Sequence, residues 1–183
     1  MSAYKSALNI LLQEANADWT VDTKLTCLTA PAAPAQNAGL VAYQDDDNFV
    51  KFVYGAAFAM RRNADAAAPA AGQLQLVVEE NGAQKTALRV SMDGIIGADN
   101  VIYLRLERKG DSYTAYYSVD GKKYTEAGAA QVVLKDVQAG LICCEGVMAM
   151  TGRGFGGAAM QMPQAAPLKA AFDEFKINSR GLK

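Results

Sequence analysis

The sequence predicts an all-β protein, a sandwich of two antiparallel sheets of the jelly-roll type. Three observations support this fold class: segments in which apolar and polar residues alternate, turn-forming pairs between them, and connections that rarely exceed a dozen residues. Roughly nine strands of ordinary length fit the chain. Its 183 residues suit one domain over 1–183. Two layered sheets bury one face of each strand and leave few exposed edges.

The N-terminal part predicts one strand clearly and a second segment that is ambiguous. Residues 19–28 alternate, which places Trp19 and Cys27 on the same apolar face, so Cys27 is expected to be a small buried side chain. Residues 6–15 include helix-forming residues, but residues 9–13 fit a strand as well, so this segment alone predicts either structure.

Two hairpins are expected next. Residues 39–44 and 49–54 flank a polar turn at 45–48, whose Asp and Asn side chains can bond their own backbone. Residues 73–80 and 84–92 flank Asn81-Gly82, for which two loop lengths compete. A two-residue loop pairs Leu76 with Ala87 and Leu74 with Arg89. A three-residue loop, which we favour, pairs Leu74 with Val90 and Leu76 with Leu88.

The stretch from residue 101 to residue 125 predicts two successive hairpins. A loop at Gly110-Asp111 places apolar side chains on one face and polar side chains on the other. The apolar pairs are Leu106–Ala115, Leu104–Tyr117 and Ile102–Val119, and the polar pairs are Arg105–Tyr116 and Glu107–Thr114. A type I′ turn at Asp120-Gly121 is expected to return Tyr124 beside Tyr117.

The remaining segments predict two more strands and two irregular connections. The strands are expected at residues 140–145 and 172–177. The Ala-rich segment 63–72 and the Gly-rich segment 151–162 are expected to be loops.

Composition excludes several kinds of chemistry. The chain has no histidine, so triads, dyads and imidazole-bound metals that need one are excluded. Its three cysteines lack metal-ligand spacing. A net charge of −1 argues against nucleic acid or a membrane surface as a partner. No apolar run reaches membrane-spanning length, and residues 1–13 lack signal-peptide features, so localisation stays unknown.

Six segments of the chain, in order, resemble the concanavalin A-like β-sandwich domain found on the C-terminal side of many glycoside hydrolases, notably family 43 β-xylosidases and arabinofuranosidases. They are NILLQ (9–13), DWTVDTKL (18–25), AGLVAYQDDDNFVKF (38–52), YLRLERKGDSYTAYYSVDGKKY (103–124), AGLICCEG (139–146) and AAFDEFKI (170–177). The resemblance implies a strand at 9–13 and an excised or shortened accessory domain without catalytic activity. Its expected partners are an oligosaccharide or polysaccharide of the xylan or arabinan type and the catalytic domain of a parent hydrolase.

Glycan binding is expected on the polar face of the predicted sheet. Sugars are held by aromatic faces and planar polar groups, usually on the concave sheet of such a sandwich. Arg105 beside Tyr116 offers both, and a solvated sheet face is the alternative. Gln13, Tyr54 and Arg61 join that surface if their strands run alongside.

Two further sites follow from the resemblance. Phe155, in the Gly-rich loop, is a candidate for closing the active-site pocket of a neighbouring domain. Asp173 matches the position of a calcium ligand in related sandwiches, so calcium is a possible cofactor.

Two other functions compete with the accessory role. One is a free-standing laminin G-like protein-interaction module. The other is a glycosidase in its own right, which needs two nearby carboxylic acids. The Glu-x-Asp-x-Glu spacing of catalytic members of this fold does not occur in the sequence. We therefore expect no catalysis by this chain.

Overall fold

A computed structural model describes the chain except residues 1–8, 16, 32–35, 57–71, 145–166 and 181–183. The described part holds eleven strands and no helix. In chain order the strands are β1 (Ile10–Glu14), β2 (Asp18–Cys27), β3 (Asn37–Asp45), β4 (Asn48–Gly55), β5 (Gln73–Glu80), β6 (Ala83–Ser91), β7 (Val101–Lys109), β8 (Ser112–Ser118), β9 (Thr125–Gln131), β10 (Gln138–Cys144) and β11 (Ala170–Arg180). Nothing in these residues is a helix long and apolar enough to cross a membrane.

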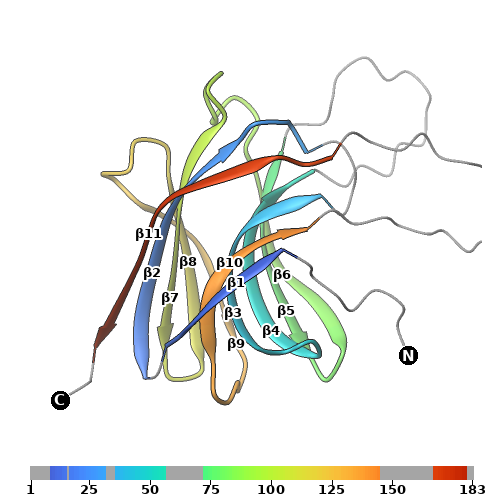
Figure 1. Ribbon diagram of the computed structural model, residues 1–183, viewed down its shortest axis with the longest axis vertical. Helices are drawn as coiled ribbons and strands as arrows, with labels where there is room; N and C mark the ends of the chain where they lie inside the picture. The colour runs from blue at the N-terminus through green and yellow to red at the C-terminus, as the bar shows by residue number, and fades with distance from the viewer. Residues whose placement is uncertain (1–8, 16, 32–35, 57–71, 145–166, 181–183) are drawn as a thin grey trace, which may run out of the picture.

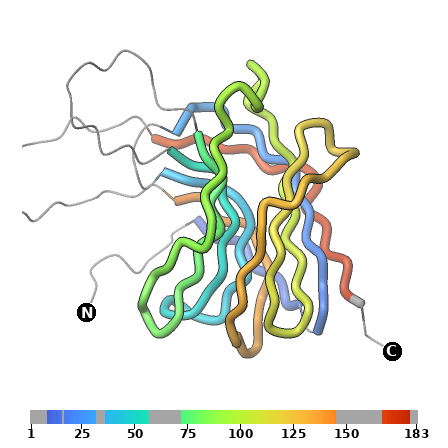
Figure 2. The backbone as a smooth tube through the Cα atoms, turned by 180° about the vertical axis from the view of Figure 1, so that it is seen from behind, coloured from blue at the N-terminus to red at the C-terminus, as the bar shows by residue number. Residues whose placement is uncertain are grey.

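The strands form two antiparallel sheets, as expected. One sheet has six strands in the order β1-β10-β3-β4-β5-β6, and the other has five in the order β11-β2-β7-β8-β9. Both sheets bend toward the same side (Figure 1), so the outer face of the six-stranded sheet is concave and that of the five-stranded sheet is convex. The edge strands β6 and β9 approach each other and close one side of the sandwich (Figure 2).

The core lies between the sheets and follows the alternation in the sequence. In β2, Trp19, Val21, Leu25 and Cys27 are all at most 2% exposed. Leu106 of β7, the partner of Val21, and Leu104, the partner of Thr23, are fully buried. Full burial of a leucine side chain contributes about 1.5–3 kcal/mol. Cys27 is therefore a buried core residue, and burial raises the pKa of its thiol to about 12.

The β7–β8 hairpin confirms most of the predicted register. Leu106 pairs with Ala115, Leu104 with Tyr117 and Arg105 with Tyr116. The last predicted pair does not form, since β8 ends at Ser118 and Val119 is 52% exposed in the following turn.

The turn after β8 differs from the type I′ turn expected. Gly121 has φ 71°, whereas Asp120 does not have the positive φ that a type I′ turn requires of both central residues. The Asp120 carboxylate instead accepts the N–H groups of Lys122 and Lys123, at 2.8 and 3.0 Å. This local bonding widens the loop, so Thr125, not Tyr124, lies beside Tyr117.

The β5–β6 hairpin combines the two loop lengths that the sequence left in competition. Asn81 (φ 52°) and Gly82 (φ 72°) form a two-residue loop, and Glu80 pairs with Ala83. A register shift between Val77 and Leu76 then gives the pairs Leu76–Leu88 and Leu74–Val90, which a three-residue loop predicts. The bulge allows Asn81-Gly82 to form a two-residue turn while Leu74 and Leu76 still face the core. The prediction of a three-residue loop was wrong, although the pairs predicted from it are confirmed.

Two other local expectations are confirmed. Residues 10–14 form an edge strand rather than a helix, because β1 pairs with β10. In the β3–β4 turn, Oδ1 of Asp45 accepts the Asp47 N–H at 2.8 Å, as expected of an Asx-type turn.

Candidate functional site

Arg105 and Tyr116 lie side by side on the convex outer face of the five-stranded sheet. They are direct partners across β7 and β8, and both are partly exposed. Asp22 of β2 is the partner of Arg105 on its other side. The prediction that Arg105 and Tyr116 share a polar face is confirmed, but the face is convex and not the concave one expected.

Arg105 is held by two contacts. Its Nε donates to Oδ1 of Asp22 at 2.6 Å, with the two side chains 35% and 16% exposed respectively. Its guanidinium stacks over the ring of Tyr124, with Cζ 4.0 Å from the ring centroid. Burial lowers the pKa of Arg105, but the bond and charge of Asp22 outweigh that effect and raise it overall. Arg105 is therefore a fixed cation that positions Asp22 and Tyr124.

Tyr116 has a looser environment. Its hydroxyl donates to Oε2 of Glu107 at 3.4 Å, and Glu107 also pairs with Lys109 at 3.1 Å. Desolvation, followed by the negative charges of Glu107 and Glu126, raises the pKa of Tyr116. The phenol is thus neutral at physiological pH and able to donate.

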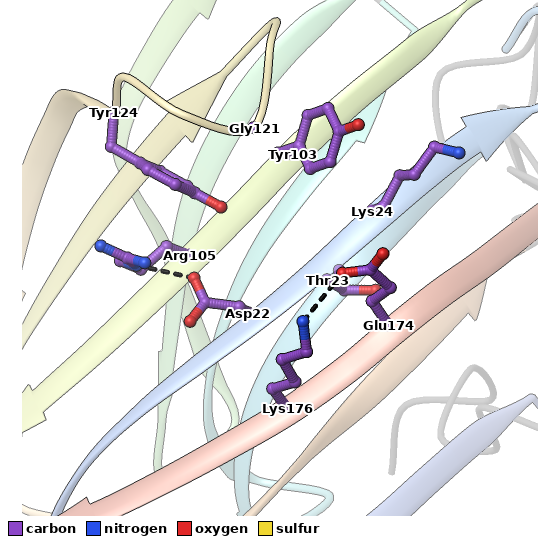
Figure 3. Close-up of a pocket in the computed structure, with 9 residues that line it drawn as sticks. All are labelled: Asp22, Thr23, Lys24, Tyr103, Arg105, Gly121, Tyr124, Glu174 and Lys176. Atoms are coloured by element: carbon purple, nitrogen blue, oxygen red, sulfur yellow. Dashed lines mark hydrogen bonds and ion pairs between the residues drawn. The ribbon is translucent and has the colours of Figure 1, made fainter.

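A shallow pocket of about 250 Å³ opens beside Arg105 on the same face (Figure 3). It lies between strands β11, β2 and β7 and the turn that follows β8. Its lining residues are Asp22, Thr23, Lys24, Tyr103, Arg105, Gly121, Tyr124, Glu174 and Lys176. Tyr116 does not belong to this lining. The sequence predicted Arg105 but not the pocket, because the pocket depends on a turn and a bulge.

The turn over the pocket is held by a local network centred on Asp120. Besides accepting the two N–H groups described above, its Oδ1 accepts the Ser118 hydroxyl at 2.8 Å. Bonds from the backbone of Lys123 and Lys122 lower the pKa of Asp120 to about 2. Gly121 packs against Tyr103 so closely that an added Cβ would lie 2.8 Å from Cε1 of that ring. A glycine is favoured here by both its positive φ and this contact.

A bulge in β11 forms the opposite side of the pocket. Asp173 pairs with Lys24 and Lys176 with Asp22, so Glu174 and Phe175 together face Thr23. Glu174 has φ 58°, a left-handed conformation that is uncommon for such a residue. Phe175 packs against the core while Glu174 is exposed and joins the pocket lining. Bulges redirect side chains in this way.

The other predicted binding residues do not join Arg105. Gln13 is in β1 and Tyr54 is in β4, both strands of the six-stranded sheet, so the expectation that they share the Arg105 surface is wrong. Tyr54 is 7% exposed and packs in the core. Arg61 and Phe155 lie outside the described residues.

Asp173 lacks the surroundings of a calcium ligand. Its carboxylate pairs with Nζ of Lys24 at 3.4 Å, and its carbonyl oxygen accepts the Thr23 hydroxyl at 3.3 Å. No group of three or more acidic, Cys or His side chains suited to a metal occurs among the described residues. Calcium requires six to eight oxygen ligands, so the described residues around Asp173 do not fit a calcium site.

The concave face carries an apolar cluster that the sequence analysis did not identify. Three members on the outer side of the six-stranded sheet are buried, Val41, Val53 and Ile142, at 1, 1 and 6% exposure. The partly buried members are Ile10, Leu12, Tyr43, Phe49 and Cys144. We call these eight residues the concave apolar cluster. The signal in the sequence was the apolar character of both faces of GLVAY and FVKFVY, which alternation alone does not reveal.

The architecture defines a jelly-roll sandwich module, and comparison with known proteins places it in a family. Residues 6–178 match the family model described as the beta xylosidase C-terminal concanavalin A-like domain. The chain therefore belongs to the C-terminal concanavalin A-like domain family of glycoside hydrolase family 43 enzymes. No curated protein matches it significantly in sequence.

Solved structures share the fold at low sequence identity. A mutant of the GH43 protein BlXynB from Bacillus licheniformis is 17% identical with a TM-score of 0.61, covering 90% of this chain and 28% of its own. A functionally unknown protein from Saccharomyces cerevisiae is 16% identical with a TM-score of 0.64, covering 93% and 74%. A xylan beta-1,4-xylosidase from Bacillus halodurans is 16% identical with a TM-score of 0.56, covering 73% and 26%. The chain thus spans about a quarter of the length of the BlXynB mutant and of the xylan beta-1,4-xylosidase.

Proposed function

We propose that this chain is a non-catalytic accessory module that supports the catalytic domain of a family 43 glycoside hydrolase. The observation that carries the proposal is the family match over residues 6–178. The similar structures agree with it, because this chain corresponds to about a quarter of the BlXynB mutant and of the xylan beta-1,4-xylosidase.

The state of the acidic residues supports a non-catalytic role. Hydrolysis of a glycoside needs one carboxylic acid to protonate the leaving group and a second carboxylate or base at a defined separation. On the convex face, Asp22 is bound to Arg105, Glu107 to Lys109, and Glu174 to Lys176 at 2.8 Å. Each of these carboxylates is paired with a cation. For Glu174 the bond from Lys176 lowers the pKa of the carboxyl, which opposes the role of a general acid.

The concave apolar cluster supports a packing role. Its partly buried members, among them Leu12, Tyr43 and Phe49, lie on an outer face, where apolar side chains that gather together mark interaction surfaces. Lys51 lies among them, with Nζ 5.9 Å from the ring centroid of Phe49. A surface of apolar side chains with few charges is typical of a stable contact between domains. We propose that the catalytic domain packs against this face.

Deletion tests the supporting role. In a longer protein that carries this chain beside a family 43 catalytic domain, removing the chain is expected to lower the melting temperature of the catalytic domain. Substituting the partly buried Leu12 by Asp on the concave face is expected to lower it as well. Thr26→Asp on the convex face, opposite the uncharged residues Val101 and Ala171, serves as the control. A catalytic domain that melts and hydrolyses substrate identically with and without the chain contradicts the proposal.

Weak glycan binding on the convex face is a second candidate. The pairing of Arg105 and Tyr116 favours it, since both present planar polar or aromatic groups to solvent. Titrating xylo- or arabino-oligosaccharides into the isotope-labelled chain is expected to give saturable shifts at these residues. An unchanged spectrum at millimolar sugar excludes this second role without affecting the first.

A further inference from the structure

We infer that the pocket under the turn at residues 119–124 binds one neutral sugar unit, with the hydroxyl of Tyr124 and the carboxylates of Asp22 and Glu174 as its hydrogen-bonding groups. This inference deepens the glycan-binding role proposed above and rests on it. It moves the binding site from the Arg105–Tyr116 pair to the adjacent pocket, which Tyr116 does not line.

The polar groups of the pocket match the hydroxyl groups of a sugar. Figure 3 shows the Tyr124 hydroxyl directed toward the Asp22 carboxylate, which also bonds Arg105, with the Lys176 ammonium below them. The Tyr103 ring forms the next part of the wall. A sugar hydroxyl both donates and accepts, so it can bond carboxylates, phenols and ammonium groups in turn.

The balance of charges selects a neutral ligand. The three cations of the pocket are each paired with a carboxylate: Arg105 with Asp22, Lys176 with Glu174, and Lys24 with Asp173. The site therefore has no net charge with which to attract an anion or a cation. A charged ligand therefore gains no net attraction at this site, whereas a neutral polyol can bond to both members of a pair.

The pocket is held in shape before a ligand arrives. The Asp120 network fixes the turn, the stack on Arg105 fixes the ring of Tyr124 at 4.0 Å, and the β11 bulge directs Glu174 outward. Few groups therefore lose freedom on binding, and a preformed site loses less affinity to ordering. The left-handed conformation of Glu174 is a local strain of the kind that concentrates at ligand sites.

The size of the pocket limits the ligand. Its volume is about 250 Å³, below the roughly 300–1,000 Å³ typical of sites for drug-sized molecules. The turn covers one side and the rest is open to solvent (Figure 3). One sugar ring fits this space, and the remainder of an oligosaccharide is expected to extend into solvent.

The test is an NMR titration of the full 183-residue chain with D-xylose, L-arabinose and xylobiose, and with D-glucuronate as the charged comparison. Saturable shifts are expected at the amides of Gly121, Thr23 and Glu174, with weaker binding of glucuronate. Tyr124→Phe keeps the ring over Arg105 but removes the hydroxyl, and is expected to weaken binding about five-fold, as for the loss of one hydrogen bond. Tyr116→Phe, the matched control on the same face, is expected to stay within about two-fold.

Three results would overturn the inference. Equal weakening by Tyr124→Phe and Tyr116→Phe in folded variants, or shifts confined to the concave face, places the sugar elsewhere and leaves the glycan-binding role standing. The absence of saturable shifts with every neutral sugar removes the pocket and the glycan-binding role together. Glu174→Gln is a second test of the site, because it removes the carboxylate but keeps the size of the side chain. It is expected to weaken sugar binding while the melting temperature of the chain changes little.

Discussion

The ion pair between Asp22 and Arg105 gives the sharpest test of the convex face. We consider the variants Asp22→Asn, Arg105→Met and the double variant. Nε and Oδ1 are 2.6 Å apart, and the side chains are only 16% and 35% exposed. Exposed pairs contribute about 0.2–1 kcal/mol, and breaking a fully buried pair costs about 3–5 kcal/mol. For this intermediate burial we expect a coupling energy of about 1–1.5 kcal/mol.

The single variant Arg105→Met is expected to lose more than the coupling alone. It also loses the stack on Tyr124, which contributes about 0.5–1 kcal/mol. The total of about 2 kcal/mol corresponds to a melting temperature lower by about 4–8 °C for a chain of this length. Asp22→Asn is expected to cost less, because the neutral amide leaves no unpaired charge.

Urea unfolding of the four proteins measures the coupling. The exposed pair Lys176–Glu174, with side chains 62% and 65% exposed, is the control and is expected to couple by less than about 0.5 kcal/mol. Raising the salt concentration to 1 M is expected to weaken the control more than the Asp22–Arg105 pair. A coupling for Asp22–Arg105 as small as that of the control would refute the view that these side chains form a fixed unit.

Four further predictions concern stability and reactivity. Leu104→Ala, at a fully buried side chain, is expected to destabilise the chain by about 2–5 kcal/mol. Leu11→Ala, at a side chain that is 64% exposed, is expected to cost below about 1 kcal/mol. Similar melting temperatures for the two variants would contradict the assigned core. Cys27, with a pKa raised to about 12, is expected to resist a thiol reagent at pH 8 until urea unfolds the chain, so rapid native labelling argues against its burial. Asn81→Ala, at φ 52°, is expected to cost about 1 kcal/mol in urea unfolding, and an unchanged midpoint would exclude the left-handed turn. The pKa of Asp120 is lowered from 3.8 to about 2 in the folded chain, so the stability that its carboxylate contributes is present above pH 4 and lost as the pH falls toward 2. Asp120→Ala is therefore expected to make the free energy of unfolding depend less on pH over that interval. An identical pH profile for the variant and the parent chain would exclude the network.

The sequence predicted the parts of the fold that depend on neighbouring residues. Alternation assigned the faces of β2 and β7, because a side chain every second residue must either meet the core or face water. Burial and loop chemistry together predicted the pairing of Arg105 with Tyr116. At β5–β6 these two signals conflicted, and the structure satisfied both through a bulge that neither signal specifies.

The candidate site was predicted only in part, for a physical reason. Arg105 follows from alternation, but its partner Tyr124 reaches it only because Asp120 widens the turn. Glu174 reaches the pocket because β11 has a bulge opposite Thr23. No local sequence pattern predicts this bulge. Gln13 and Tyr54 were assigned wrongly, because the order of strands within the two sheets depends on long-range pairing that a single sequence does not encode locally.

The most direct test of the accessory role is a hydrolysis assay of the purified chain alone. Chromogenic xylosides and arabinofuranosides are the substrates, since the chain belongs to a domain family of beta xylosidases. The account predicts release no faster than in buffer, at a chain concentration where a family 43 enzyme gives a strong signal. Release that scales with chain concentration, and that is lost in a folded Glu107→Gln or Glu174→Gln variant, would contradict it.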